Sequence, residues 1–111
     1  MNEVLKILCN HNVNIMNVGL PFPSTIISEL CGMTLYKTRK ELKRLKEEGL
    51  VTSQIYCEKT DDGNFLLRGY IITDKAKDTE EYKWAWEEQR VLFKSVYNVD
   101  IGEYTGGWPL T

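Results

Sequence analysis

Apolar residues recur along the chain at two spacings, and the changes of spacing predict the order of the elements. In residues 1–11 they fall at every third or fourth position, as in a helix with one buried face. The same spacing resumes after a start at Pro23 or Ser24 and stops at Gly32, residue types that suit the two ends of a helix. The apolar stripe predicted for this second helix is Ile26, Ile27, Leu30 and Cys31.

A third helix is predicted for residues 35–48, separated from the second by only Met33 and Thr34. Thr34 is a suitable N-cap, and Gly49 ends the helix. Its predicted buried face consists of Thr38, Leu42 and Leu45, with Leu35 beside it. Two short helices joined by a tight turn are typical of a helix-turn-helix.

Beyond Gly49 the apolar period changes to two, which indicates strands. Residues 51–58 and 65–72 are predicted to be two strands, with Val51, Ile55 and Cys57 alternating on one face. The polar cluster 59–64 contains an Asp62–Gly63 pair, a common signal for the turn of a hairpin. By contrast, residues 10–23 are rich in Asn, Gly and Pro and predict turns, with a short extended stretch at Val13, Ile15 and Val18.

The last long helix is predicted to begin near Thr73 or Asp74 and to end near Tyr97. Trp84 and Trp86 cannot share one narrow stripe, so this helix is apolar on more than one side. The helix has more aromatic residues than one covering helix needs, which favours pairing with a second copy of the chain. The alternative is that the helix covers only its own domain. The predicted dimer surface is Tyr82, Trp86, Phe93 and Tyr97. Residues 98–111 predict an irregular tail, docked by Tyr104 and Trp108.

The composition fits one globular domain of 111 residues, with 42% hydrophobic and 27% charged residues. No apolar run is long enough to span a bilayer, and no signal peptide is expected. The three cysteines, Cys9, Cys31 and Cys57, are odd in number and widely spaced, which favours reduced core thiols and a cytoplasmic protein over disulfides or zinc.

Charge is distributed unevenly although the net charge is only −2. Residues 34–51 hold six cations against three anions, whereas residues 74–103 hold five cations against eight anions. The basic segment therefore coincides with the predicted third helix. A cationic helix that is second in a helix-turn-helix favours contact with nucleic acid, but it is also compatible with a solvated face.

The segment from Ser28 to Val51 resembles bacterial winged-helix regulators of the MarR, PadR and ArsR type. The matching runs are Glu29-Leu30-Cys31-Gly32, Thr34, and Leu42-Lys43-Arg44-Leu45-Lys46-Glu47-Glu48-Gly49-Leu50-Val51. The strand end from Gly69 to Lys75 is also similar to the junction into their C-terminal helix. The resemblance covers about residues 24–77. It implies an α+β winged helix-turn-helix fold, with a three-helix core, a two-stranded β-hairpin wing and a long C-terminal helix.

Under this interpretation the winged helix-turn-helix occupies residues 1–77, a C-terminal helix residues 78–97 and a tail residues 98–111. The resemblance implies that the third helix enters the major groove of double-stranded DNA. The implied base contacts are Tyr36, Lys37, Arg39 and Lys40. The implied phosphate contacts are Thr34, Lys43 and Arg44, and the implied DNA contacts of the wing are Lys59 and Arg68. Asp61 and Asp62 depart from the basic wings of such families, because carboxylates repel the DNA backbone.

Two functions from different classes remain open at this point. The first is a DNA-binding, repressor-like homodimer; the second is a protein-interaction module, such as a phage or plasmid adaptor, that does not bind DNA. The acidic wing and the aromatic last helix favour the second. No enzyme, cofactor or metal site is expected. The lone histidine, His11, is interpreted as a helix-end residue, and no nucleophile–base pair or phosphate-binding loop occurs.

Overall fold

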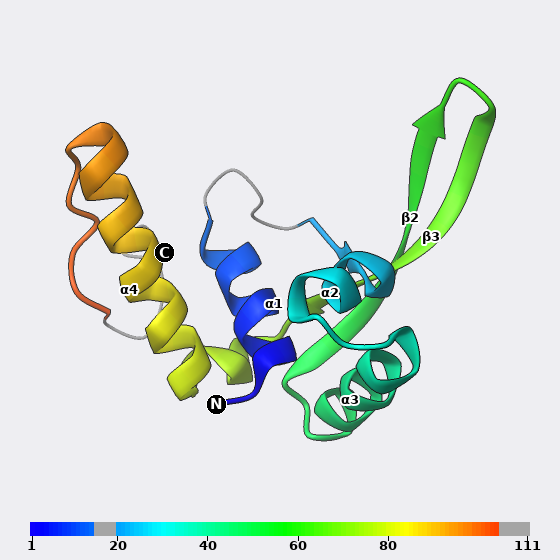
Figure 1. The fold of residues 1–111 in the computed structure, drawn as a ribbon, viewed down its shortest axis with the longest axis horizontal. Helices are drawn as coiled ribbons and strands as arrows, with labels where there is room; N and C mark the ends of the chain where they lie inside the picture. The colour runs from blue at the N-terminus through cyan, green and yellow to red at the C-terminus, as the bar shows by residue number, and fades with distance from the viewer. Residues whose placement is uncertain (15–19, 105–111) are drawn as a thin grey trace.

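The computed structural model describes residues 1–14 and 20–104, which form an α+β arrangement of four α-helices and a three-stranded antiparallel sheet. In chain order the elements are α1 (Glu3–Val13), β1 (Phe22–Pro23), α2 (Ser24–Cys31), α3 (Leu35–Glu47), β2 (Val51–Thr60), β3 (Gly63–Ile72), the 3₁₀ helix η1 (Asp74–Asp78) and α4 (Glu80–Tyr97). Figure 1 shows α1 between α4 and α2, while the β2–β3 hairpin projects away from the body.

Helix α1 is the centre of the core. Its buried side chains, which pack against α4, α2 and β3, are Val4, Leu5, Leu8, Cys9 and Val13. Val13 thus closes the helix and does not start an extended stretch, whereas Ile15 and Val18 lie outside the described residues. Met1, which shares the predicted stripe, is 62% exposed because the helix begins only at Glu3.

The turn between α2 and α3 depends on Gly32. This residue has a φ of 64°, a left-handed conformation that glycine adopts without steric cost, and its N–H bonds to the carbonyl of Glu29. The start at Ser24 and the end at Gly32 confirm the predicted bounds of α2. The predicted stripe of α2 is confirmed for Ile27, which is buried, and for Cys31, which packs against the core. It is wrong for Ile26 and Leu30, which are 40% and 56% exposed. An eight-residue helix at the surface buries only one narrow line of side chains.

The sheet has the strand order β1–β3–β2, and β2 is therefore an edge strand. The hairpin register runs from Val51 opposite Ile72 to Thr60 opposite Gly63, so only two residues form the turn. The predicted six-residue turn, 59–64, is thus too long. Residues 59, 60, 63 and 64 still pair across the hairpin, because polar side chains do not prevent backbone hydrogen bonds between antiparallel strands.

Strand β1 was not expected, because its two residues lie in the Pro-rich segment that predicts a turn. Phe22 pairs with Tyr70 and Pro23 with Gly69, in an antiparallel arrangement. Pro21 lies so close to Gly69 that a Cβ at position 69 would collide with the Pro21 side chain and lie 2.9 Å from its carbonyl carbon. The absence of a side chain at Gly69 therefore permits β1 to reach the sheet.

Helix α4 starts later than predicted, since η1 occupies residues 74–78. The Thr79 hydroxyl accepts a hydrogen bond from the Tyr82 N–H at 3.3 Å and so caps α4. Tyr82 and Trp86 then point into the core and are 0% exposed. The Trp86 Nε1–H donates to the Gly102 carbonyl at 2.8 Å, and the Tyr104 ring packs on both aromatic residues.

This packing corrects the dimer surface predicted on α4. Tyr82 and Trp86 belong to the core of their own chain, so they offer no surface to a second copy. Phe93 is half-buried and its ring packs at a tilt of 46° against that of the exposed Tyr97, with ring centroids 5.4 Å apart. Tyr104 docks the tail as expected, whereas Trp108 lies outside the described residues.

The three cysteines lie in three different environments. Cys9 is buried, and burial raises the pKa of its thiol to about 12. Cys31 is half-buried, and Cys57 is exposed on the hairpin, so the expectation of three core thiols is wrong for Cys57. None of the helices in residues 1–14 and 20–104 is long and apolar enough to cross a membrane.

Candidate nucleic-acid interface

Helix α3 separates an apolar inner face from a cationic outer face. Thr38, Leu42 and Leu45 are buried at 0–1% exposure and fix the helix to the core. Thr34 caps the helix: its hydroxyl accepts the Lys37 N–H at 3.2 Å, while its carbonyl accepts the Thr38 hydroxyl at 2.9 Å. Both the predicted cap and the predicted buried face are confirmed, and they fix which side of α3 faces outward.

The outer face of α3 carries most of the residues predicted to contact DNA. Tyr36 is 76% exposed at the start of the helix. The exposed cationic side chains on the outer side of α3 are Lys37, Arg39, Lys40, Lys43 and Arg44, and Glu47 is exposed beside them. Among the described residues, Lys37, Lys40 and Lys43 form no salt bridge, so their ammonium groups are available to an external anion.

Arg44 differs from these lysines, because it is held by two carboxylates of its own helix. Its Nε donates to Glu41 at 3.0 Å, and its second terminal nitrogen also bonds to Glu41. The first terminal nitrogen bonds to Glu48 at 2.6 Å. The hydrogen bonds from Arg44 hold the pKa of the Glu41 carboxyl below its usual value. A phosphate contact by Arg44 would have to compete with these partners.

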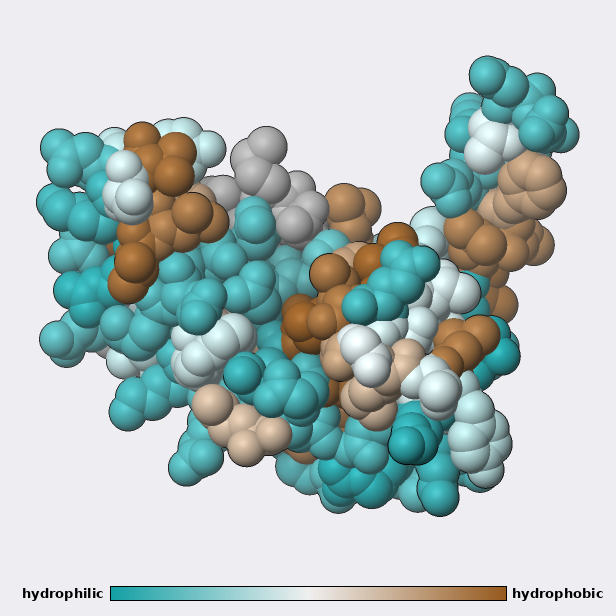
Figure 2. Space-filling view, in the orientation of Figure 1, coloured by the Kyte–Doolittle hydropathy of each residue, from teal (hydrophilic) through white to brown (hydrophobic). Residues whose placement is uncertain are grey.

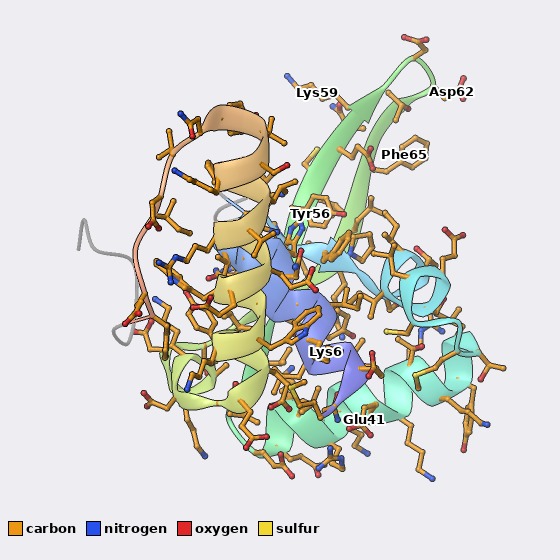
Figure 3. The ribbon with its side chains drawn as sticks, turned by 60° about the vertical axis from the view of Figure 1, so that its left-hand side comes forward. Lys6, Glu41, Tyr56, Lys59, Asp62 and Phe65 are labelled. Carbon is orange, nitrogen blue, oxygen red and sulfur yellow. The ribbon has the colours of Figure 1, made fainter. Side chains whose placement is uncertain are left out.

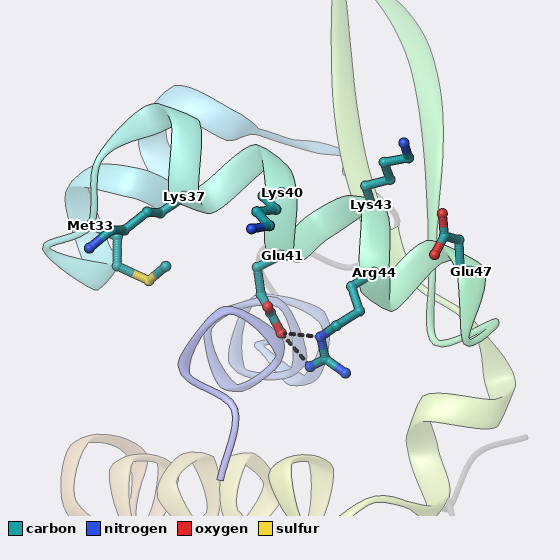
Figure 4. A pocket seen from close by; sticks show the side chains of 7 residues that line it. All are labelled: Met33, Lys37, Lys40, Glu41, Lys43, Arg44 and Glu47. Carbon is teal, nitrogen blue, oxygen red and sulfur yellow. Dashed lines mark hydrogen bonds and ion pairs between the residues drawn. The ribbon is translucent and has the colours of Figure 1, made fainter.

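Glu41 also connects α3 to the N-terminus of α1. The Asn2 side-chain amide donates to the Glu41 carboxylate, while the Asn2 side-chain oxygen accepts the Leu5 N–H at 2.9 Å and caps α1. Figure 4 shows the Glu41 carboxylate bonded to Arg44, directly above the turns of α1. Sequence reasoning missed this link because Asn2 and Glu41 are 39 residues apart.

A shallow hollow of about 550 Å³ follows the basic side of α3. Its lining residues are Met33, Lys37, Lys40, Glu41, Lys43, Arg44 and Glu47. Figure 4 shows the lysine side chains extending separately along this side of the helix rather than converging on one point. Spaced cations of this kind suit a charged surface such as a phosphate backbone better than a small ligand.

The hairpin residues of the predicted site lie apart from α3. Lys59 is opposite Asn64 near the tip, and Arg68 is opposite Ile55, four ladder pairs closer to the body. Figure 3 shows Lys59 extending from one face of the hairpin near the acidic tip, which is marked by Asp62. The fold brings the α3 residues together on one face but does not bring Lys59 or Arg68 into that group.

Two further lysines, Lys46 of α3 and Lys75 of η1, make structural hydrogen bonds that the sequence did not indicate. Lys46 Nζ donates to the Ser53 hydroxyl of β2 at 3.0 Å. Lys75 Nζ donates to the Glu48 carbonyl at the C-terminal end of α3 at 2.6 Å, where a cation is favoured by the helix dipole. Both contacts join α3 to later parts of the chain and fix the angle at which its outer face is presented.

His11 lies near the C-terminal end of α1, where its ring stacks on Phe22 at 4.1 Å. Its Nε2 is 3.0 Å from the Leu20 carbonyl, and burial lowers the pKa of the imidazole. In residues 1–14 and 20–104, no three His, Cys, Asp or Glu side chains are grouped so that they could hold a metal ion.

Comparison of the chain with protein-family models, with curated protein sequences and with solved structures gave no significant match.

Proposed function

We propose that this protein binds duplex DNA as a regulator with a winged helix-turn-helix fold. The observation that carries the proposal is the outer face of α3, where Lys37, Lys40 and Lys43 are exposed without salt bridges among the described residues. An α-helix of this width fits the major groove, and α3 is held by a tight turn and by its buried inner face. The element order, with a hairpin directly after α3, supports a winged-helix topology.

In this mechanism the cations position the protein, and a few side chains near the start of α3 read the bases. Tyr36, Lys37 and Lys40 lie in the first half of the helix, where the N-terminus of a recognition helix meets base edges. Lys43 follows one turn later and is placed for a phosphate. Arg44 contributes less, because Glu41 and Glu48 already neutralise it.

The test is fluorescence anisotropy of a labelled duplex titrated with protein at two salt concentrations, roughly 50 and 200 mM. Counterion release predicts that the wild-type affinity falls steeply with salt. The double variant Lys37→Ala/Lys40→Ala should lose affinity at least about tenfold, since each removed cation contact costs about 1 kcal/mol or more. Its circular dichroism spectrum should stay that of the wild type, because both side chains are exposed.

A matched control removes the same charge elsewhere. Lys83 and Lys94 are exposed on α4, so Lys83→Ala/Lys94→Ala also lowers the net charge by two without touching α3. The control should bind DNA within about twofold of the wild type. Equal losses in the two double variants, or no binding at low salt, would contradict the proposal.

The second candidate function is a protein-interaction module. It is favoured by the C-terminal half of α4, where Val91, Val96 and Tyr97 are 60–68% exposed. Figure 2 shows an apolar patch at this end of α4, surrounded by polar residues. Such patches mark interaction sites in many proteins. Salt-dependent DNA binding that is lost in the α3 double variant would favour the first function over this one.

A further inference from the structure

The β2–β3 hairpin exposes large apolar side chains on both of its faces. Residues opposite each other in an antiparallel pair share a face, so Ile55, Cys57 and Leu66 lie on one face. Tyr56, Phe65 and Leu67 lie on the other. Ile55 is 66% exposed, Phe65 49% and Leu66 77%. Figure 2 shows apolar residues along the middle of the hairpin beneath a polar tip.

The hairpin also has free backbone edges. Strand β1 pairs with β3 only at Gly69 and Tyr70, and β2 is the outermost strand of the sheet. Figures 1 and 3 agree that the hairpin leaves the body beyond this point. Unpaired edge strands bind other strands readily, and a two-stranded hairpin alone is marginally stable in water.

We propose that the β2 edges of two copies of this chain pair antiparallel about a two-fold axis at Cys57, forming a four-stranded sheet. The exposed part of β2, from Gln54 to Thr60, is symmetric about Cys57 in length. A two-fold contact of this kind is closed, so it yields a dimer and not a filament. The proposal is independent of DNA binding by α3.

The charges along β2 agree with this register. With Cys57 opposite Cys57 of the second copy, Glu58 lies opposite Tyr56 and Lys59 lies opposite Ile55, so no like charges oppose each other across the new ladder. The aromatic ring of Tyr56 gains a cross-strand neighbour in both chains. Because the strands are antiparallel, the two acidic tips lie at opposite ends of the four-stranded sheet.

Each acidic tip then meets a lysine of the other chain. In the proposed register Thr60 is opposite Gln54 of the second copy, so Asp61, the first residue of the turn, lies next to Ser53 of that copy, whose hydroxyl accepts a hydrogen bond from Lys46 Nζ at 3.0 Å. Lys46 is exposed, and its position beside β2 is fixed by that hydrogen bond. The register thus forms two equivalent cross-chain ion pairs between Lys46 and Asp61, one at each end of the contact.

Neighbouring registers are less favourable on the same grounds. An axis one residue closer to the tip would oppose Glu58 to Glu58. An axis one residue closer to the body would place Lys59 opposite Ser53, against Lys46 of the other chain. Like charges directly opposite on strands are destabilising, so charge selects the register centred on Cys57.

The first test is sedimentation velocity of the full chain without DNA, at tens of micromolar. The wild type should sediment as a dimer. Cys57→Asp places two carboxylates against each other on the axis and should raise the dimer dissociation constant at least about tenfold, whereas Cys57→Ser should leave it unchanged. Asn64→Asp adds the same charge to the same face of the hairpin on β3, and it should remain dimeric.

Cys57 also reports the register directly. Opposite Cα atoms in an antiparallel pair are about 4.5–5.5 Å apart, a separation that a disulfide spans. Diamide, which accepts two electrons and two protons from two thiols, should therefore convert the wild type into a covalent dimer on a non-reducing gel. Cys57→Ser should remain uncrosslinked, since burial raises the pKa values of the Cys9 and Cys31 thiols and suppresses their thiolates.

A charge exchange tests the ends of the contact. Lys46→Glu and Asp61→Lys should each weaken the dimer several-fold, and the combined variant should recover it. A monomeric wild type, a dimer that Cys57→Asp leaves intact, or absence of recovery in the combined variant would overturn the proposal. None of these results depends on whether α3 binds DNA, so the two proposals fail separately.

Discussion

Helix α3 and the β2–β3 hairpin follow each other in the chain but relate to the rest of the protein in opposite ways. In α3 the side chains of Leu42 and Leu45 turn toward the core, and Tyr36 and most of the charges face outward. In the hairpin, apolar side chains lie exposed on both faces, and all the charges except Arg68 lie at or beside the tip. The apolar inner face of α3 is thus covered by its own chain, whereas the hairpin has apolar side chains that a single chain leaves exposed.

This difference assigns the two regions different roles. A helix with a buried anchor is rigid and can present side chains to a ligand at a fixed angle. A projecting two-stranded hairpin lacks such an anchor and gains stability from any strand or surface that covers it. The three pairs of variants below test whether the contrast holds in stability, in DNA affinity and in the response to pH.

The largest difference is expected in stability. Leu42 is 1% exposed beneath α3, so Leu42→Ala should lower the free energy of unfolding by about 2–5 kcal/mol. Leu66 is 77% exposed on the hairpin, and Leu66→Ala should change it by less than about 0.5 kcal/mol. Urea denaturation followed by circular dichroism measures both. A large loss in the Leu66 variant would show that the side chain is covered in solution.

An intermediate effect is expected on DNA binding. Lys43→Ala on α3 should reduce the slope of log affinity against log salt by about 0.9, the value of one phosphate contact. Lys59→Ala on the hairpin should leave the slope unchanged, because Glu58, Asp61 and Asp62 make the tip acidic. Anisotropy titrations over a salt series give both slopes. Equal reductions of the salt slope in the two variants would indicate that Lys59 also contacts DNA, and α3 and the hairpin would then not differ in this respect.

The smallest effect concerns pH. Glu41 has a pKa below its usual value because of Arg44, so its contribution to stability is present above about pH 4.5 and is lost as the pH falls through the lower native value. Glu41→Gln should therefore cost at most about 1 kcal/mol at pH 7, with the difference from wild type shrinking between about pH 5 and 3. Glu58→Gln on the hairpin removes no salt bridge of the described residues and should change the free energy of unfolding at pH 7 by less than about 0.5 kcal/mol. Thermal melts measure both variants.

Local signals in the sequence predicted α2, α3 and the two strands well. Gly32 and Thr34 have chemical preferences that decide a helix end by themselves, and the structure uses both as expected. The outer face of α3 was also predictable, since the buried side chains Leu42 and Leu45 fix the rotation of the helix. The winged-helix identity and the DNA contacts stay predictions.

The features that sequence reasoning missed depend on distant partners. Strand β1 has only two residues, and it exists because Gly69, far along the chain, leaves space for Pro21. On α4 aromatic residues occur on several sides, so periodicity could not decide that Tyr82 and Trp86 face inward. In the hairpin, alternation placed Ile55 with the buried Val51. It could not reveal that the strands leave the body between these residues.

The contact at Gly69 makes one position of the chain a marker of the three-stranded sheet. Any other residue there would push Pro21 away and release β1 from β3. A divergent relative that keeps this three-stranded sheet must therefore keep glycine at this site, even where its α3 surface has changed to suit another ligand. A relative that has lost the glycine must join α1 to α2 by a different path. The residue at this position in a related gene can thus indicate whether the third strand is kept before the structure of its product is known.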